Sequence, residues 1–251
     1  MHKAAIALAT VATVIGTPAL AADLAVKAPP AAPPAFSWTG FYIGGNAGYA
    51  WGTTTGVDEI ATNGLCWFSC NENWTAGTHG FTGGGQVGVN WQTGIAVFGV
   101  EADAGYLGLK GHAIEPNTDG GTFVNTNGGF FTTVRGRLGA SFLPSNTVLV
   151  YLTGGYIGAD LDSTVGTNAA APVQLLNVSN TGFQSGWTWG TGVEWAWNNN
   201  WSVKVEWLHY EFEHNKTIGG NFAGGGSTVQ FFGIDNIGNL VRAGLNYRFN
   251  W

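Results

Sequence analysis

Residues 241–251 alternate between apolar and polar side chains with a period of two. From Val241 to Trp251, every odd position is apolar or aromatic, and every even position is charged, polar or glycine. Because successive side chains of a β-strand point to opposite faces, this pattern predicts a strand with one apolar and one polar face. Strands of membrane β-barrels have this pattern, since one face meets lipid and the other meets the barrel interior.

The N-terminal residues predict how such a strand reaches a membrane. Lys3 precedes the apolar run 4–15, and Ala19-Leu20-Ala21 is a small-residue cleavage pattern. These features are typical of a secretory signal peptide, residues 1–21, whose apolar run is shorter than the roughly 20 residues of a transmembrane helix. Residues 22–37 contain four prolines and predict an extended linker on the periplasmic side.

Composition narrows the class of protein further. The chain has 41 glycines and 12 tryptophans among 251 residues, and only 10% of its residues are charged. Disordered chains lack so much aromatic bulk, whereas membrane barrels place aromatic residues at both lipid interfaces. Without the signal peptide, 8 basic against 15 acidic residues leave a net charge of −7. We therefore expect no nucleic-acid partner.

Alternation predicts eight strands in residues 38–251. They cover residues 40–51, 80–91, 95–106, 130–142, 148–158, 187–197, 201–212 and 239–251. Short connections alternate with long ones, and this is the asymmetry between the periplasmic turns and the external loops of outer-membrane barrels. We predict an all-β fold, an eight-stranded antiparallel up-and-down transmembrane β-barrel in the outer membrane of a Gram-negative cell. The even strand count places both termini in the periplasm.

Nine charged side chains fall on the polar faces of these strands. They are Glu101, Asp103, Arg135, Arg137, Glu194, Lys204, Glu206, Arg242 and Arg248. An Arg or Lys that faces lipid at mid-depth costs roughly 2–4 kcal/mol. An eight-stranded barrel is just wide enough inside for side chains to fill it. We therefore expect these nine groups to form a network of paired charges that fills the lumen.

Other chemistry has weaker support in the sequence. Residues 83–88 match a dinucleotide-binding glycine pattern, but they lie in a strand pattern with no helix after it. His209 and Glu211, with Glu213 and His214, cluster at the end of one strand, but no serine is spaced to act with His209. We expect no enzymatic activity, no cofactor and no metal site. Cys66 and Cys70 are the only cysteines, and in an exported chain we expect them to form a disulfide.

The strands together resemble a known family. The segments that carry the resemblance are WTGFYIGGNAGY at 38–49, GGGQVGVNWQ at 83–92, VRGRLG at 134–139, LTGGY at 152–156, GTGVE at 190–194 and RAGLNYRF at 242–249. They look like the small OmpA-like outer-membrane barrels of alphaproteobacteria, the group that includes the 25- and 31-kDa major outer-membrane proteins and is often labelled as porins. The resemblance implies an abundant structural protein with little or no porin activity.

The resemblance also implies partners. Some members are joined covalently to peptidoglycan through a mature N-terminus that begins Ala-Asp, and Ala22-Asp23 matches that start. The C-terminal aromatic residues Tyr247, Phe249 and Trp251 correspond to the signal that the barrel-assembly machinery recognises, although phenylalanine is usual at the last position. Lipid and lipopolysaccharide would surround the barrel. We expect a role in envelope integrity, with a narrow diffusion porin and a receptor or adhesin that uses the external loops as alternatives.

Overall fold

The computed structural model describes eight ranges of the chain. They are residues 36–58, 73–114, 122–142, 146–167, 178–180, 182–213, 216–221 and 229–249. Several predictions fall outside these ranges: the signal peptide, the peptidoglycan-attachment residues Ala22 and Asp23, the disulfide between Cys66 and Cys70, and the terminal Trp251.

The described residues form eleven strands. These are β1 Gly40–Asp58, β2 Asn73–Thr93, β3 Ala96–Leu107, β4 Lys110–Ile114, β5 Thr122–Phe142, β6 Val148–Thr167, β7 Val178–Asn180, β8 Phe183–Ala196, β9 Trp201–Phe212, β10 Lys216–Asn221 and β11 Val229–Phe249. No helix in the described ranges is long and apolar enough to cross a membrane.

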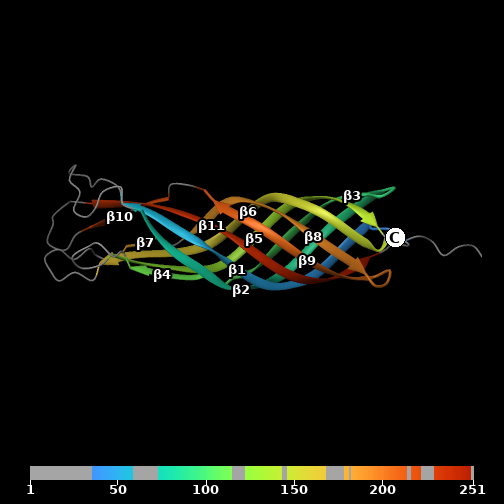
Figure 1. Cartoon of the computed structure of the whole chain (residues 1–251), viewed down its shortest axis with the longest axis horizontal. Coiled ribbons are helices and arrows are strands. Elements are labelled where there is room, and N and C mark those ends of the chain that lie inside the picture. Colours follow the sequence, from blue (N-terminus) through green and yellow to red (C-terminus); the bar gives the residue numbers. More distant parts are fainter. Residues whose placement is uncertain are drawn as a thin grey trace, which may run out of the picture. The chain divides into compact units, whose positions relative to one another are not determined.

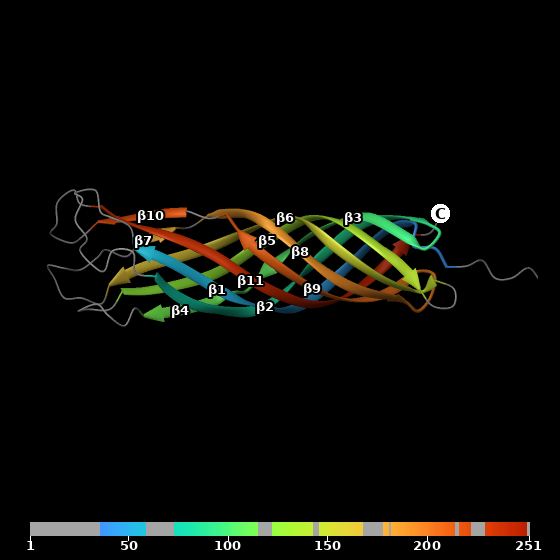
Figure 2. The ribbon, with the colours of Figure 1, turned by 45° about the horizontal axis from the view of Figure 1, so that its top comes forward.

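Eight of the strands close into a ring. In the order β1, β2, β3, β5, β6, β8, β9, β11, each is antiparallel to the next, and β11 pairs with β1 along 18 consecutive residue pairs. The tilted strands wrap around a common axis (Figures 1 and 2). The short strands β4, β7 and β10 extend the sheet at the end away from the C-terminus. The predicted eight-stranded antiparallel barrel is confirmed.

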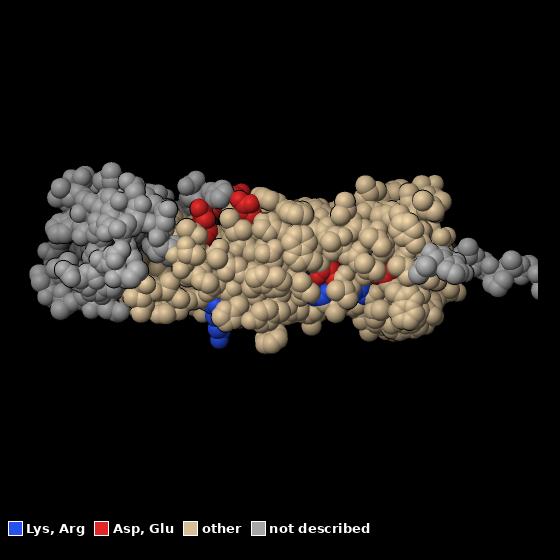
Figure 3. Space-filling model, in the orientation of Figure 1, with Lys and Arg blue, Asp and Glu red and all other residues tan. Residues whose placement is uncertain are grey.

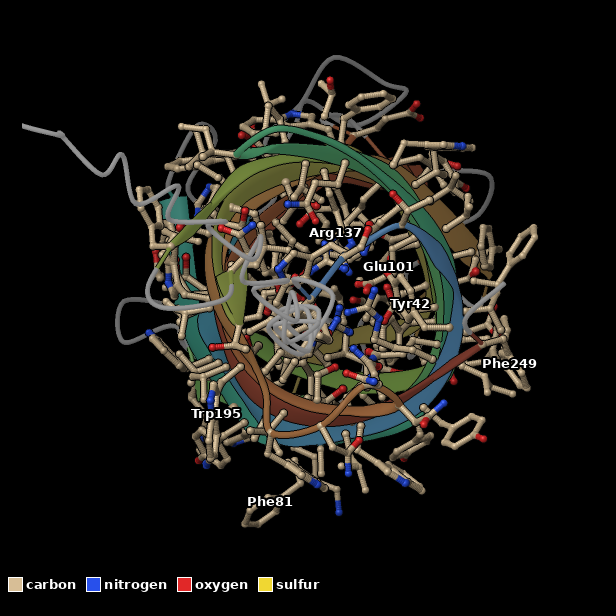
Figure 4. All side chains as sticks on the ribbon, turned by 90° about the vertical axis from the view of Figure 1, so that its right-hand side faces the viewer. Tyr42, Phe81, Glu101, Arg137, Trp195 and Phe249 are labelled. Carbon is tan, nitrogen blue, oxygen red and sulfur yellow. The ribbon has the colours of Figure 1, made fainter. Side chains whose placement is uncertain are left out.

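The two faces of the wall have opposite character. Phe81, Trp195 and Phe249 point away from the barrel, whereas Glu101 and Arg137 point into it (Figure 4). Phe81 is 79% exposed and Glu101 is fully buried. Over the strands, most of the outer face in view is uncharged, with only small groups of charged atoms (Figure 3). An apolar exterior around a charged interior is the polarity of a membrane barrel and the reverse of a water-soluble one.

Most strands are longer than predicted at the long-loop end. β5 begins at Thr122 instead of residue 130, and β11 begins at Val229 instead of residue 239. Crossing a bilayer takes only about 9–11 residues of a strand. Beyond that length the outer face meets water, so outward residues such as Asn125 and Asn127 are polar and the alternation disappears. The backbone hydrogen bonds between neighbouring strands do not depend on that alternation, so the strands continue beyond the bilayer length.

Two glycines make room for tyrosine rings inside the barrel. Gly88 on β2 is the direct cross-strand partner of Tyr42 on β1, and Gly192 on β8 is the partner of Tyr151 on β6. A Cβ atom added to either glycine would overlap the ring of its partner. Both tyrosines are nearly completely buried. The missing side chains therefore let the rings lie close to the neighbouring strand and project into the interior.

The Gly88 site gives a direct test of this packing. We predict that Gly88→Ala lowers the free energy of unfolding by about 1–3 kcal/mol, because the tyrosine ring must leave its position in a filled interior. Urea titration of the protein in lipid vesicles measures the change. The matched control is Gly85→Ala on the same strand, where an added Cβ would meet no atom closer than 3.9 Å. Equal stabilities of the two variants would contradict the packing role.

Candidate functional site

The middle of the barrel interior holds eight charged side chains in mutual contact. Four are carboxylates and four are cations, so their formal charges cancel. They are Glu101, Asp103, Glu194, Glu206, Arg135, Arg137, Lys204 and Arg242. None is more than 5% exposed. We refer to these eight residues as the charged layer.

Glu101 is the centre of the charged layer. Its Oε1 lies 2.5 Å from Nη2 of Arg135 and 2.7 Å from Nζ of Lys204. Its Oε2 accepts a hydrogen bond of 2.7 Å from the hydroxyl of Tyr42. Arg137 and Arg242 approach the same carboxylate at 3.4 and 3.6 Å. All four cations of the layer therefore converge on one carboxylate.

Several of these contacts cross the interior. Lys204 on β9 and Glu101 on β3 stand four strands apart in the ring of eight, on opposite sides of the barrel. Arg242 on β11 reaches Oδ1 of Asp103 on β3 at 2.7 Å. Arg135 on β5 reaches Oε1 of Glu206 on β9 at 3.1 Å. The side chains thus occupy the cross-section of the barrel instead of lining a space.

Arg137 has a separate environment of aromatic rings. Its Cζ lies 3.9 Å from the centroid of the Tyr151 ring and 5.6 Å from that of Tyr42. Its Nη2 donates to Glu194 at 2.7 Å, and its Nη1 donates to the hydroxyl of Tyr42 at 2.6 Å. The tyrosines therefore stabilise the guanidinium through both their π faces and a hydroxyl.

Neutral polar side chains complete the network, and the sequence analysis did not single them out. Gln86 donates to Asn246 at 2.5 Å, and Asn246 donates to Glu194 at 2.8 Å. Ser202 also donates to Glu194, at 2.6 Å. All three side chains lie on the inward face of their strands. The alternation that puts these residues on the inward face could have identified them, because a polar residue on that face does not contact lipid.

Apolar clusters lie on both sides of the charged layer. Toward the long loops, the buried cluster consists of Ala50, Leu107, Leu109, Phe131, Ile157, Ala159, Leu161, Leu208, Tyr210, Phe212 and Leu240. Toward the short turns, it consists of Phe36, Trp38, Val97, Leu149, Tyr151 and Ala196. The interior is therefore not polar along its whole length: an apolar cluster lies on each side of the charged layer, and beyond the long-loop cluster the hydroxyl of Thr54 donates to Asn236 at 2.6 Å.

Arg248 also lies buried inside the barrel, but its closest partners differ from those of the charged layer. Its guanidinium packs against the rings of Phe36 and Trp38, with 4.7 Å from Cζ to each centroid. Its Nη2 donates to the carbonyl of Ser37 at 2.7 Å. Arg248 stands six residues beyond Arg242 on the same inward face of β11, toward the chain end, where the short-turn cluster replaces the carboxylates.

The aromatic residues of the C-terminal strand lie at the lipid-facing surface. Phe249 is half exposed, and the Tyr247 ring packs edge-on against both Phe249 and Trp201, with centroids 5.1 Å apart in each pair. His209 also faces outward, with its ring near those of Trp187 and Trp189. Among the described residues, no group of three or more His, Cys, Asp or Glu side chains is arranged to hold a metal ion.

Comparisons with known proteins agree with this geometry. A family model described as the outer membrane protein beta-barrel domain matches residues 17–250. The chain belongs to this family. It is 35% identical to the 31 kDa outer-membrane immunogenic protein of Brucella melitensis, over 96% of this chain and 98% of that protein. It is 33% identical to the 22 kDa outer membrane protein of Rhizobium leguminosarum, over 72% of this chain and 67% of that one.

A solved structure supports the fold independently. The outer membrane protein OprG of Pseudomonas aeruginosa superposes with a TM-score of 0.54, covering 86% of this chain and 99% of that one at 12% identity. The predicted family, the alphaproteobacterial small outer-membrane barrels, is confirmed, and so is the outer membrane as its location. The relatives are named as outer-membrane and immunogenic proteins, not as enzymes.

The central carboxylate gives the sharpest test of the charged layer. We predict that Glu101→Gln destabilises the barrel by about 3–5 kcal/mol, because removing one partner leaves buried cations uncompensated. Urea titration in lipid vesicles measures the loss. Glu213→Gln is the control, since Glu213 is exposed and surface substitutions usually stay within about 0.5 kcal/mol. A loss below about 1 kcal/mol for Glu101→Gln would show that the charged layer is not held together through this residue.

Proposed function

We propose that this protein is a structural component of the outer membrane that is neither a channel nor an enzyme. The observation that carries the proposal is the filled interior: eight buried charges that cancel in number and contact one another across the barrel, with apolar clusters on both sides. A diffusion channel needs a continuous polar path, and these contacts argue against the narrow-porin alternative. The receptor alternative rests on the long loops, whose central residues lie outside the described ranges.

We propose further that the mature N-terminus is joined to peptidoglycan, as the family resemblance implies. The α-amine of Ala22 would take over the acyl group of a peptide stem, so that one amide bond forms while another breaks and its amine leaves with the proton. Residues 22–35 could span about 43 Å at about 3.1 Å per residue. The predicted linker ends at Ser37, and this span leaves out Phe36 and Ser37 because both contact the barrel.

The tether is tested on isolated cell walls. We predict that digestion of purified sacculi with muramidase, followed by trypsin, releases a peptide that begins at Ala22 and carries a muropeptide mass. Asp23→Ala keeps the barrel intact and should lose this adduct, because it removes the Ala-Asp start. Wild-type sacculi with only unmodified Ala22 peptide would refute the tether and leave the filled barrel unaffected.

A further inference from the structure

The chain enters the barrel through a short segment that packs inside its short-turn end. Phe36 and Trp38 belong to the buried cluster there, together with Val97 and Leu149. Trp38 is fully buried, and its ring meets that of Phe36 edge-on with centroids 5.0 Å apart. A segment that only leads into a strand needs no such burial. We call residues 36–39 the entry segment.

Hydrogen bonds join the entry segment to two of the three short turns. The backbone N–H of Trp38 donates to Oε1 of Gln92 at 2.7 Å, next to the β2–β3 turn. The backbone N–H of Gln92 in turn donates to the hydroxyl of Thr39 at 3.0 Å. The indole N–H of Trp38 donates to the carbonyl of Asn146, in the β5–β6 turn, at 2.8 Å.

Arg248 joins the segment to the third turn. Its guanidinium packs on the rings of Phe36 and Trp38 and donates to the carbonyl of Ser37. Its backbone N–H donates to the carbonyl of Asn200, in the β8–β9 turn, at 2.7 Å, and Nδ2 of Asn200 donates back to the carbonyl of Arg248 at 3.1 Å. The four residues of the entry segment are thus connected to all three short turns and to the last strand.

We propose that the entry segment is a mechanical clasp, which transfers tension on the N-terminal linker to the whole short-turn rim. Without it, a pull on the linker would act on the first residue pairs of β1, Gly40 with Asn90 and Phe41 with Phe249. With it, the buried indole, the stacked guanidinium and the hydrogen bonds to three turns must yield before β1 is loaded. This inference rests on the proposed cell-wall tether, since only a tethered linker carries tension.

Single-molecule force spectroscopy tests the clasp. The mature protein in a lipid bilayer is pulled from an N-terminal tag. We expect the wild type to show a first force peak, at short extension, before the peaks of strand extraction, and Trp38→Ala to lose it. The control is Trp201→Ala: this tryptophan lies at the same end but faces outward and stacks on Trp197, so the first peak should remain.

A second variant covers the case in which Trp38→Ala does not assemble. Arg248→Lys keeps the charge but lacks the planar guanidinium that packs on the two rings, and the first peak should fall. A first peak that is unchanged in both variants, or that is missing in the wild type, would overturn the clasp. The Ala22 muropeptide tests the tether independently of the force measurement. If the muropeptide is absent but the first peak is intact, the tether is refuted. If the muropeptide is present but the first peak is missing, the clasp is refuted.

Discussion

The structure depends on the compensation of charge inside a narrow barrel. A single buried ion costs several kcal/mol in a protein interior even after relaxation, and the charged layer alone holds eight. Four carboxylates offset four cations, and the Glu101 carboxylate receives all four cations within 3.6 Å. Because these contacts reach across the barrel, the groups that stabilise one another also occupy the space a solute would need.

The interior changes in polarity along the barrel axis. At mid-depth the outer face must be apolar, so polarity is confined to the inside, where it has to be paired. Toward the long loops the interior becomes an apolar core around residues such as Phe131 and Leu208, and farther out it is polar again, where Thr54 donates to Asn236. The entry segment closes the opposite end with Trp38. The entry segment and the barrel therefore share one packed cluster, and a pull on the first would reach the second.

Much of this arrangement could be predicted from alternation alone. The period of two assigned the lipid-facing and inward faces of the C-terminal strand. The tight β8–β9 turn implies that Glu194 and Lys204 lie directly opposite each other on neighbouring strands. Yet the carboxylate of Glu194 binds Arg137, while Lys204 binds Glu101. Partners across a barrel depend on its diameter and strand stagger, and neither can be read from one strand. The burial of Phe36 and Trp38 was not predicted, because the proline-rich segment before them shows neither a strand nor a helix periodicity.

The central claim is that the paired charges close the barrel, and ion conductance tests it most directly. The purified, refolded protein is inserted into planar lipid bilayers, and single-channel current is recorded over a range of voltages, with insertion checked by protease protection in matched vesicles. The account predicts no steady conductance from the inserted wild-type barrel. A stable, reproducible open-channel current that scales with salt concentration would contradict it.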